Sequence, residues 1–127
     1  LARMNRLDLR YNRIGPHGVA ALVKSPRAMP VVSLDLTGNS IGDGGVHALT
    51  LSSCLPKLRR LAIGQNRFGD WGAATLAGSA LMKQLGFLDV SQNQITQYGI
   101  DALYAARKSD DVVIESAGNF ASVGGGR

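Results

Sequence analysis

The chain is poor in the side chains that carry out chemistry at neutral pH. It contains two histidines, His17 and His47, and a single cysteine, Cys54. Histidine and cysteine can together hold zinc, and a cysteine beside a histidine can act as a nucleophile, but these three residues show no such spacing. The patterns H-E-x-x-H and G-x-x-x-x-G-K-[ST] do not occur either. We therefore predict no catalytic residue, no metal site and no cofactor, with Cys54 as an inert buried thiol and both histidines on the surface.

One glycine-rich run has the composition of a phosphate-binding loop. This run, Gly42-Asp43-Gly44-Gly45, matches a second segment further along the chain, Gly69-Asp70-Trp71-Gly72. Aspartate is a preferred residue at the start of a helix, where its side chain accepts hydrogen bonds from free backbone N–H groups. We expect Asp43 and Asp70 to serve as helix caps, and we prefer this interpretation to a phosphate cradle.

Composition sets the outer bounds on fold and partners. The chain has 127 residues, 45% of them hydrophobic, which fits one domain. No apolar run approaches the roughly 18 residues of a membrane span, and no basic-then-apolar leader opens the chain, so we expect a soluble protein without a membrane role. A single cysteine excludes an intrachain disulfide and suits a reducing, cytoplasmic location. The formal net charge of +5 favours acidic partners.

The elements that must position any site come from an internal repeat. Four segments align without gaps, each running from an aliphatic residue to an asparagine, and the asparagines Asn12, Asn39, Asn66 and Asn93 are 27 residues apart. A degraded fifth copy ends at Asn119, after a spacing of 26, and has Ser116 where the other copies have an aliphatic residue. Such polar drift is typical of a terminal capping repeat.

Each repeat contains one strand and one helix. Leu34 and Leu36 alternate with polar residues, which predicts a strand with one covered face, and Val46 and Leu49 have the spacing of an amphipathic helix. The repeat glycine before the helical pair, such as Gly45, suggests a close approach of the helix to the neighbouring strand or loop. Parallel strands lie about 4.8 Å apart whereas packed helices need about 8–10 Å, so the sheet must bend away from its helices. The fold class is thus α/β, a right-handed horseshoe-shaped solenoid with a parallel sheet on the concave face and helices on the convex face.

The repeated asparagines have a structural explanation. A carboxamide carries donors and acceptors that can replace lost backbone partners at a sharp turn, in its own turn and in the next repeat. We expect a buried ladder, and the members of this structural asparagine ladder are Asn12, Asn39, Asn66 and Asn93.

The run L-x-L-x-x-N-x-I-G-x-x-G-V-x-A-L, found at residues 34–49, resembles the ribonuclease-inhibitor type of leucine-rich repeat. Related repeats form the arcs of NOD-like receptors and Ran GTPase-activating proteins. The resemblance covers about residues 4–121 and implies a leucine-rich-repeat domain over residues 1–121. Residues 122–127 show no periodicity, so we expect a disordered tail there. The period of 27 is slightly shorter than is usual for that type. Because the first repeat has no recognisable cap, we expect either a truncated chain or an N-terminal edge that another chain, or a second copy, covers.

Side chains that the repeat geometry leaves free gather on the concave face, where they form columns across the sheet. Arginine, aspartate and aromatic residues mix there, as in protein interfaces, so we predict a non-enzymatic module that binds a partner protein. The alternative is a solvated face on which Arg6 and Asp8 neutralise each other. The predicted partner-binding residues are Arg6, Asp8, Arg10, Tyr11, Asp35, Thr37, Arg60, Gln65, Phe87, Asp89, Ser91 and Gln92.

Two further functions stay open at this point. Basic residues cluster in the first and third repeats, which would suit nucleic acid or another phosphate ligand, although Asp8 and Asp35 would repel phosphate. The resemblance to Ran GTPase-activating proteins implies a possible role in regulating a partner enzyme. The basic clusters are Arg3, Arg6, Arg10 and Arg13 in the first repeat, and Lys57, Arg59, Arg60 and Arg67 in the third.

Overall fold

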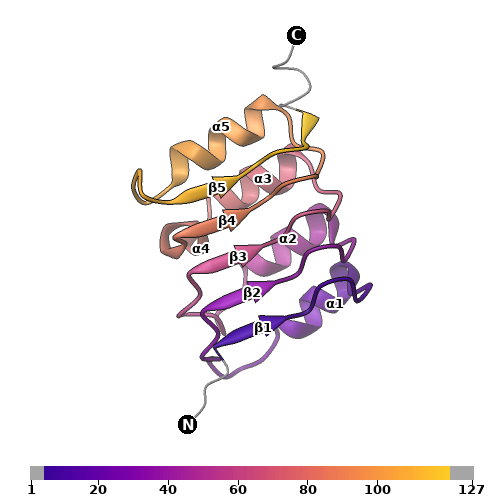
Figure 1. Ribbon diagram of the computed structural model, residues 1–127. Coiled ribbons are helices and arrows are strands. Elements are labelled where there is room, and N and C mark those ends of the chain that lie inside the picture. Colours follow the sequence, from indigo (N-terminus) through magenta and orange to yellow (C-terminus); the bar gives the residue numbers. More distant parts are fainter. Residues whose placement is uncertain (1–4, 121–127) are drawn as a thin grey trace.

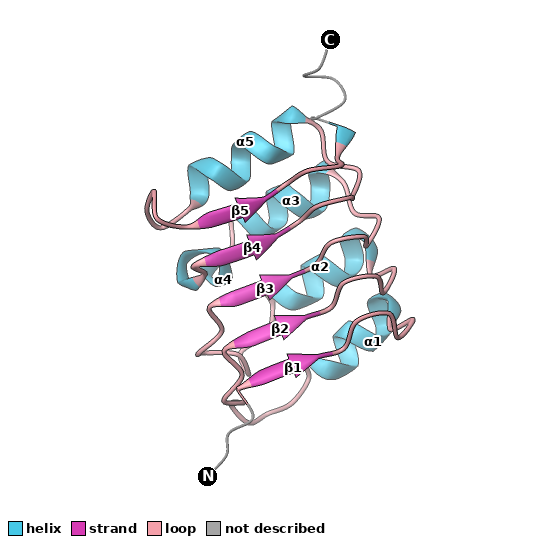
Figure 2. Cartoon of the chain, in the orientation of Figure 1, coloured by secondary structure: helices cyan, strands magenta, loops and turns pink. Residues whose placement is uncertain are grey.

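The computed structural model describes residues 5–120 and shows one layer of strands against one layer of helices (Figures 1 and 2). Both the expected tail at residues 122–127 and Arg3 lie outside the described residues. The elements are β1 (Arg6–Asp8), α1 (Gly15–Leu22), β2 (Ser33–Asp35), α2 (Gly42–Thr50), β3 (Arg60–Ala62), α3 (Asp70–Ala77), α4 (Ala80–Gln84), β4 (Phe87–Asp89), α5 (Gln97–Ala106) and β5 (Val113–Glu115).

The strands form one parallel sheet in chain order, β1-β2-β3-β4-β5. Their register is that of the repeat, since Leu7, Leu34, Leu61, Leu88 and Ile114 stand side by side. Helices α1, α2, α3 and α5 pack one on the next over a single face of this sheet (Figure 1). The predicted α/β solenoid is confirmed, and the degraded fifth copy supplies the edge strand β5.

The core lies between the two layers and is continuous along the solenoid. Its largest members in the second repeat, Leu34, Leu36 and Ile41, are at most 1% exposed. Their counterparts in the first repeat, including Leu7 and Leu9, are only half-buried, because β1 is the edge strand of the described sheet.

The repeat glycine at the first turn of each helix is explained by packing against the preceding loop. A Cβ atom on Gly45 would lie 2.5 Å from Cβ of Ile41, and one on Gly72 would lie 3.0 Å from the ring of Phe68. Ile41 and Phe68 both follow a repeat asparagine by two residues and fill the core at the turn. Any side chain larger than hydrogen at these glycines would push the helix away from the sheet.

The asparagines form a ladder whose direction differs from our expectation. Oδ1 of Asn66 accepts the backbone N–H groups of Asn39 at 2.8 Å and Ile41 at 3.2 Å, while its Nδ2 donates to the carbonyl oxygens of Leu36 at 3.0 Å and Gly64 at 2.9 Å. Asparagine therefore completes its own turn and the turn of the preceding repeat, whereas the sequence analysis assigned it to the next one.

Burial also separates the ladder members. Asn39 and Asn66 are fully buried and Asn93 is 5% exposed, and Asn119 extends the ladder by accepting the N–H groups of Asn93 and Ile95. The prediction that Asn12 would be buried is wrong. Its side chain is exposed because no strand of residues 5–120 lies beyond β1, and it donates only to backbone carbonyls of its own turn.

Asp43 and Asp70 do act at helix starts, but in the repeat that follows their own. Asp43 Oδ1 accepts the N–H groups of Gly69 and Gly72, both at 2.9 Å, and so caps α3. Asp70 accepts the backbone N–H of Thr96 at 2.8 Å and the hydroxyl of Thr96 at 2.5 Å, at the start of α5. Each aspartate thus ties one helix to the next.

Candidate functional site

The face of the sheet opposite the helices carries two parallel rows of side chains. We call the row at the amino ends of the strands the first row and the row at their carboxyl ends the second row. The first row is Arg6, Ser33, Arg60, Phe87 and Val113, and the second row is Asp8, Asp35, Ala62, Asp89 and Glu115.

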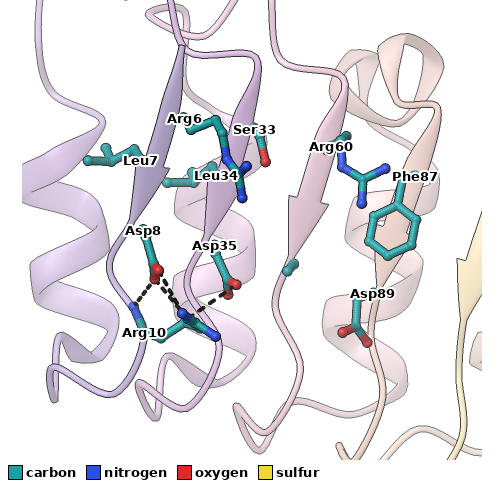
Figure 3. A pocket seen from close by; sticks show the side chains of 11 residues that line it. Arg6, Leu7, Asp8, Arg10, Ser33, Leu34, Asp35, Arg60, Phe87 and Asp89 are labelled. Carbon is teal, nitrogen blue, oxygen red and sulfur yellow. Dashed lines mark hydrogen bonds and ion pairs between the residues drawn. The ribbon is translucent and has the colours of Figure 1, made fainter. Parts of the chain in front are cut away.

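Most residues of both rows line one shallow hollow of about 310 Å³ (Figure 3). It is formed where neighbouring strands hold unequal side chains side by side, such as Ser33 between two arginines and Ala62 between two aspartates. The predicted partner-binding residues that line it are Arg6, Asp8, Arg10, Asp35, Arg60, Phe87 and Asp89.

The remaining predicted residues lie outside this hollow. Tyr11, Gln65 and Gln92 have left-handed backbones, with φ of 55°, 54° and 54°, in the turn that follows each strand. Tyr11 covers Gly38 there, so its ring belongs to the rim of the face. Thr37 and Ser91 stand between the strands and these turns and contact the second-row aspartates.

Two residues of the rows, Val113 and Glu115, were not among the predicted site residues. Both are exposed on β5 and stand beside Phe87 and Asp89 in the sheet register. The signal was present in the sequence, since aligning Ile114 with Leu88 places Val113 and Glu115 in the two rows. Their omission followed from treating the fifth copy only as a cap.

The second-row aspartates have a structural task as well as a charge. Each accepts the backbone N–H two residues further along, Asp8 at 3.2 Å, Asp35 at 3.0 Å and Asp89 at 2.9 Å. The hydroxyl of Thr37 also donates to Asp35, at 2.6 Å. These bonds fix the carboxylates at the point where each strand turns towards its asparagine. One oxygen of each aspartate is thereby occupied within the chain.

Charge is balanced at one end of the face. Arg10 donates to both oxygens of Asp8, at 2.9 and 2.8 Å, and its Nε lies 3.7 Å from Oδ2 of Asp35. This paired hydrogen bond from Arg10 holds the pKa of the Asp8 carboxyl below its ordinary value and raises the pKa of Arg10. The predicted neutralisation on this face is present, but the hydrogen-bonded partner of Asp8 is Arg10, and Arg6 contributes only a smaller charge interaction to the lowered pKa of Asp8.

The other charges of the face have no such partner. Within residues 5–120 no salt bridge joins Arg6 or Arg60 to a carboxylate, and none joins Asp89 or Glu115 to a cation. The guanidinium of Arg60 instead lies over the ring of Phe87, 4.2 Å from its centre (Figure 3). This stacking restrains Arg60 while leaving its N–H donors available.

The described basic residues of the first and third repeats do not all gather in one place. Arg6 and Arg60 stand in the first row, and Arg10 is paired with Asp8. Arg13 and Arg67 lie in the left-handed turns at the opposite ends of the strands. Basic residues of one repeat are therefore divided between the two ends of its strand.

The residues best suited to chemistry remain apart. His17 and His47 are exposed on α1 and α2, and the ring of His47 packs edge-on against Trp71. Cys54 is buried, with its Sγ 3.8 Å from the carbonyl oxygen of Val23. In the described part of the chain, no group of three or more histidine, cysteine, aspartate and glutamate residues is arranged to hold a metal ion.

One catalytic pattern escaped the sequence analysis. Residues 38–42 read G-N-S-I-G and match the G-x-S-x-G turn that presents the nucleophile in many hydrolases. Ser40 does have a left-handed backbone between a strand and a helix, with φ of 54°, but Arg13 and Arg67 adopt the same conformation at the same repeat position. The turn is a property of the repeat, and no hydrogen bond links the Ser40 hydroxyl to a histidine in the described residues.

None of the helices in residues 5–120 has the length and apolar character needed to cross a membrane. No curated protein matches the sequence of this chain. A family model described as "Leucine Rich repeat" matches residues 4–23, 28–49 and 54–77, which together make up half of the chain. These are the first three of the repeats that stack in the sheet, and repeats of this family generally mediate contacts between proteins. The chain belongs to the leucine-rich repeat family.

Proposed function

We propose that this chain is a non-enzymatic binding module, of the ribonuclease-inhibitor type, that holds a partner protein on its concave face. The observation that carries the proposal is the set of charges without a partner on that face, Arg6 and Arg60 in the first row and Asp89 and Glu115 in the second. Charged groups left unpaired around an open hollow are available to a second molecule, which would bring complementary groups.

Variation between the repeats supports the same conclusion. The buried positions of the strand stay aliphatic in all of the first four repeats, because each of them packs against helices. The rows differ from strand to strand, with arginine, serine and phenylalanine at one position. Geometry fixes where these side chains stand but not what they are, so they can encode recognition.

Nucleic acid is a weaker candidate for this face. Its phosphates would be attracted to Arg6 and Arg60 but repelled by Asp89 and Glu115 in the neighbouring row. Only Phe87 offers an aromatic ring in the two rows, and Arg60 already covers one side of that ring.

The edge of the described sheet at β1 is a second surface that we propose for association, with another copy or another chain. The half-buried Leu7 and Leu9 and the exposed Asn12 all lie along this edge. Sedimentation equilibrium over a range of concentrations tests whether two copies of this chain associate through this edge. A monomer at every concentration would exclude self-association, and a Leu9→Lys variant that abolishes a dimer would place the contact at this edge.

Affinity capture with two matched variants tests binding on the concave face. One variant replaces Arg6, Arg60, Phe87 and Asp89 with alanine. The control replaces Lys24, Arg27, Tyr98 and Asp101 with alanine. These residues are exposed outside the two rows, and their replacement removes the same number of positive charges, negative charges and aromatic rings. We expect the concave variant to lose a specific protein that the wild type and the control retain, while circular dichroism shows all three folded. Equal capture by all three would contradict the proposal, and a captured species that nuclease removes would redirect it to nucleic acid.

A further inference from the structure

The unpaired charges of the concave face are arranged diagonally. The unpaired cations, Arg6 and Arg60, stand in the first row on β1 and β3. The unpaired anions, Asp89 and Glu115, stand in the second row on β4 and β5. At the β1–β2 end of the second row, Arg10 pairs with Asp8 and its Nε lies 3.7 Å from Asp35, so its single positive charge offsets part of the negative charge of these two aspartates.

Each pair of like charges can hold one opposite charge of a partner. Arg6 and Arg60 flank Ser33, and the three line a second hollow with Asn5 and Val32 at the amino ends of the strands. A carboxylate above Ser33 would be within reach of both guanidinium groups, and Arg60 is already restrained by Phe87. Asp89 and Glu115 are neighbours in the register, and a cation between them would relieve their repulsion.

The distance between these two positions follows from sheet geometry. The position above Ser33 lies on β2, and the position between Asp89 and Glu115 lies midway between β4 and β5. They are about two and a half strand spacings of about 4.8 Å apart across the sheet, and the two rows are separated by about 6.6 Å along the strands. The diagonal is therefore about 14 Å, which an extended chain covers in about four residues. Ala62 and the free side of the Phe87 ring lie beneath this line, so the intervening residues meet apolar surface.

Resting on the proposed function, we propose that the concave face binds an extended segment of its partner protein that carries an acidic and a basic residue about four positions apart. The acidic residue lies between Arg6 and Arg60, and the basic residue lies between Asp89 and Glu115. The residues between them are small or apolar. Recognition thus depends on the spacing of two opposite charges and not on net charge, so an overall neutral segment binds.

Defined peptides test this spacing. The probe is acetyl-Gly-Glu-Ala-Leu-Ala-Arg-Gly-amide, and the control peptide has the same composition with glutamate and arginine adjacent, acetyl-Gly-Ala-Glu-Arg-Leu-Ala-Gly-amide. Binding is followed by chemical-shift changes of the ¹⁵N-labelled full chain. We expect the probe to bind about three- to tenfold more tightly than the control, with shifts confined to the two rows, since one well-placed charge pair has this order of effect.

Variants of the chain assign the two ends of the segment. Arg60→Gln should remove the preference for the probe, whereas Arg67→Gln should keep it, because Arg67 carries the same charge in the same repeat at the far end of the strand. Glu115→Lys should weaken binding of the probe and improve binding of a peptide with glutamate in place of the arginine. This reversal requires a direct charge contact and would not follow from a general loss of structure.

Equal binding of both peptides, or shifts outside the two rows, would overturn the spacing rule. Tighter binding of a thymidine oligonucleotide than of the probe, at the same salt concentration, would overturn it in favour of phosphate. In either case the proposed function still stands if the concave variant loses its captured protein. If the concave and control variants both keep that protein, the proposed function itself fails.

Discussion

Replacing Asn66 with alanine tests the asparagine ladder most directly. The side chain is fully buried and makes four hydrogen bonds. The carbonyl groups it serves keep another donor each, since Leu36 also accepts from Asn39 and Gly64 also accepts from Gly38. The N–H groups of Asn39 and Ile41 make no other hydrogen bond within residues 5–120 and would be left unpaired. Two buried unpaired donors at about 1–3 kcal/mol each, reduced by any water that enters the vacated space, give a loss of about 3 kcal/mol in the free energy of unfolding.

Urea unfolding followed by circular dichroism measures this loss, and thermal unfolding should show a fall in Tm on the order of 10 °C. Asn12→Ala is the matched control, since Asn12 occupies the same repeat position but is exposed and accepts no hydrogen bond from another repeat in residues 5–120. We expect the control to cost less than about 1 kcal/mol. Equal losses for the two variants, or a loss below about 1 kcal/mol for Asn66→Ala, would refute the argument that the ladder acts through buried donors of the neighbouring repeat.

Three further predictions follow from the packing and the charges. Asp43→Ala should lower the free energy of unfolding by about 1–2 kcal/mol in urea titrations, because α3 loses its cap, whereas the exposed Asp111→Ala should stay within about 0.5 kcal/mol. Gly45→Ala should lower the free energy of unfolding by about 1–3 kcal/mol, because the new Cβ would contact Ile41. The Cβ of Gly78→Ala would meet nothing closer than 3.6 Å, so this variant should be neutral or more stable by up to about 1 kcal/mol, and equal effects of the two in thermal melts would contradict the argument. Arg10 lowers the pKa of Asp8, so the ion pair is fully formed above the ordinary carboxyl pKa and is lost as the pH falls through the lowered pKa of the folded state. In Arg10→Gln, an NMR titration of the Asp8 carboxyl should show a higher pKa, and an unchanged pKa would count against the pairing.

The fold could be predicted because the repeat constrains every layer of it. Alternation at Leu34 and Leu36 fixes a strand face, the spacing of Val46 and Leu49 fixes a helix face, and the constant period places equivalent residues in register. The short helix α4 was not foreseen, because it occupies the return segment of only one repeat and is started by the hydroxyl of Ser79, which accepts from Met82. The sequence analysis also did not predict which neighbouring repeat the asparagines and the capping aspartates contact. An asparagine, or an aspartate such as Asp43, can reach the repeat before or after its own, and the repeat pattern is the same in both cases.

The candidate site was predictable in position and less so in detail. The strand register placed Arg6, Arg60 and Phe87 in one row, but whether Arg60 stacks on Phe87 or pairs with a carboxylate depends on side-chain rotamers. The same holds for Arg10, which lies beyond its strand and still reaches back to Asp8 and towards Asp35. Sequence spacing gives the set of residues on a face, and the pairing among them decides which charges remain available.

Because the ladder asparagines after Asn12 each serve the turn before their own, the array of described repeats has two unlike ends. Deleting whole repeats from the amino-terminal side leaves the asparagine bonds of the remaining turns complete, although loss of Asp43 or Asp70 would take the cap from the first helix that is kept. Deleting repeats from the carboxyl-terminal side takes away the acceptor for the last retained turn, where the N–H groups of Asn93 and Ile95 now rely on Asn119. For the asparagine ladder, shortening is therefore less disruptive from the amino-terminal side, and any new carboxyl-terminal boundary needs a replacement residue that closes the final turn.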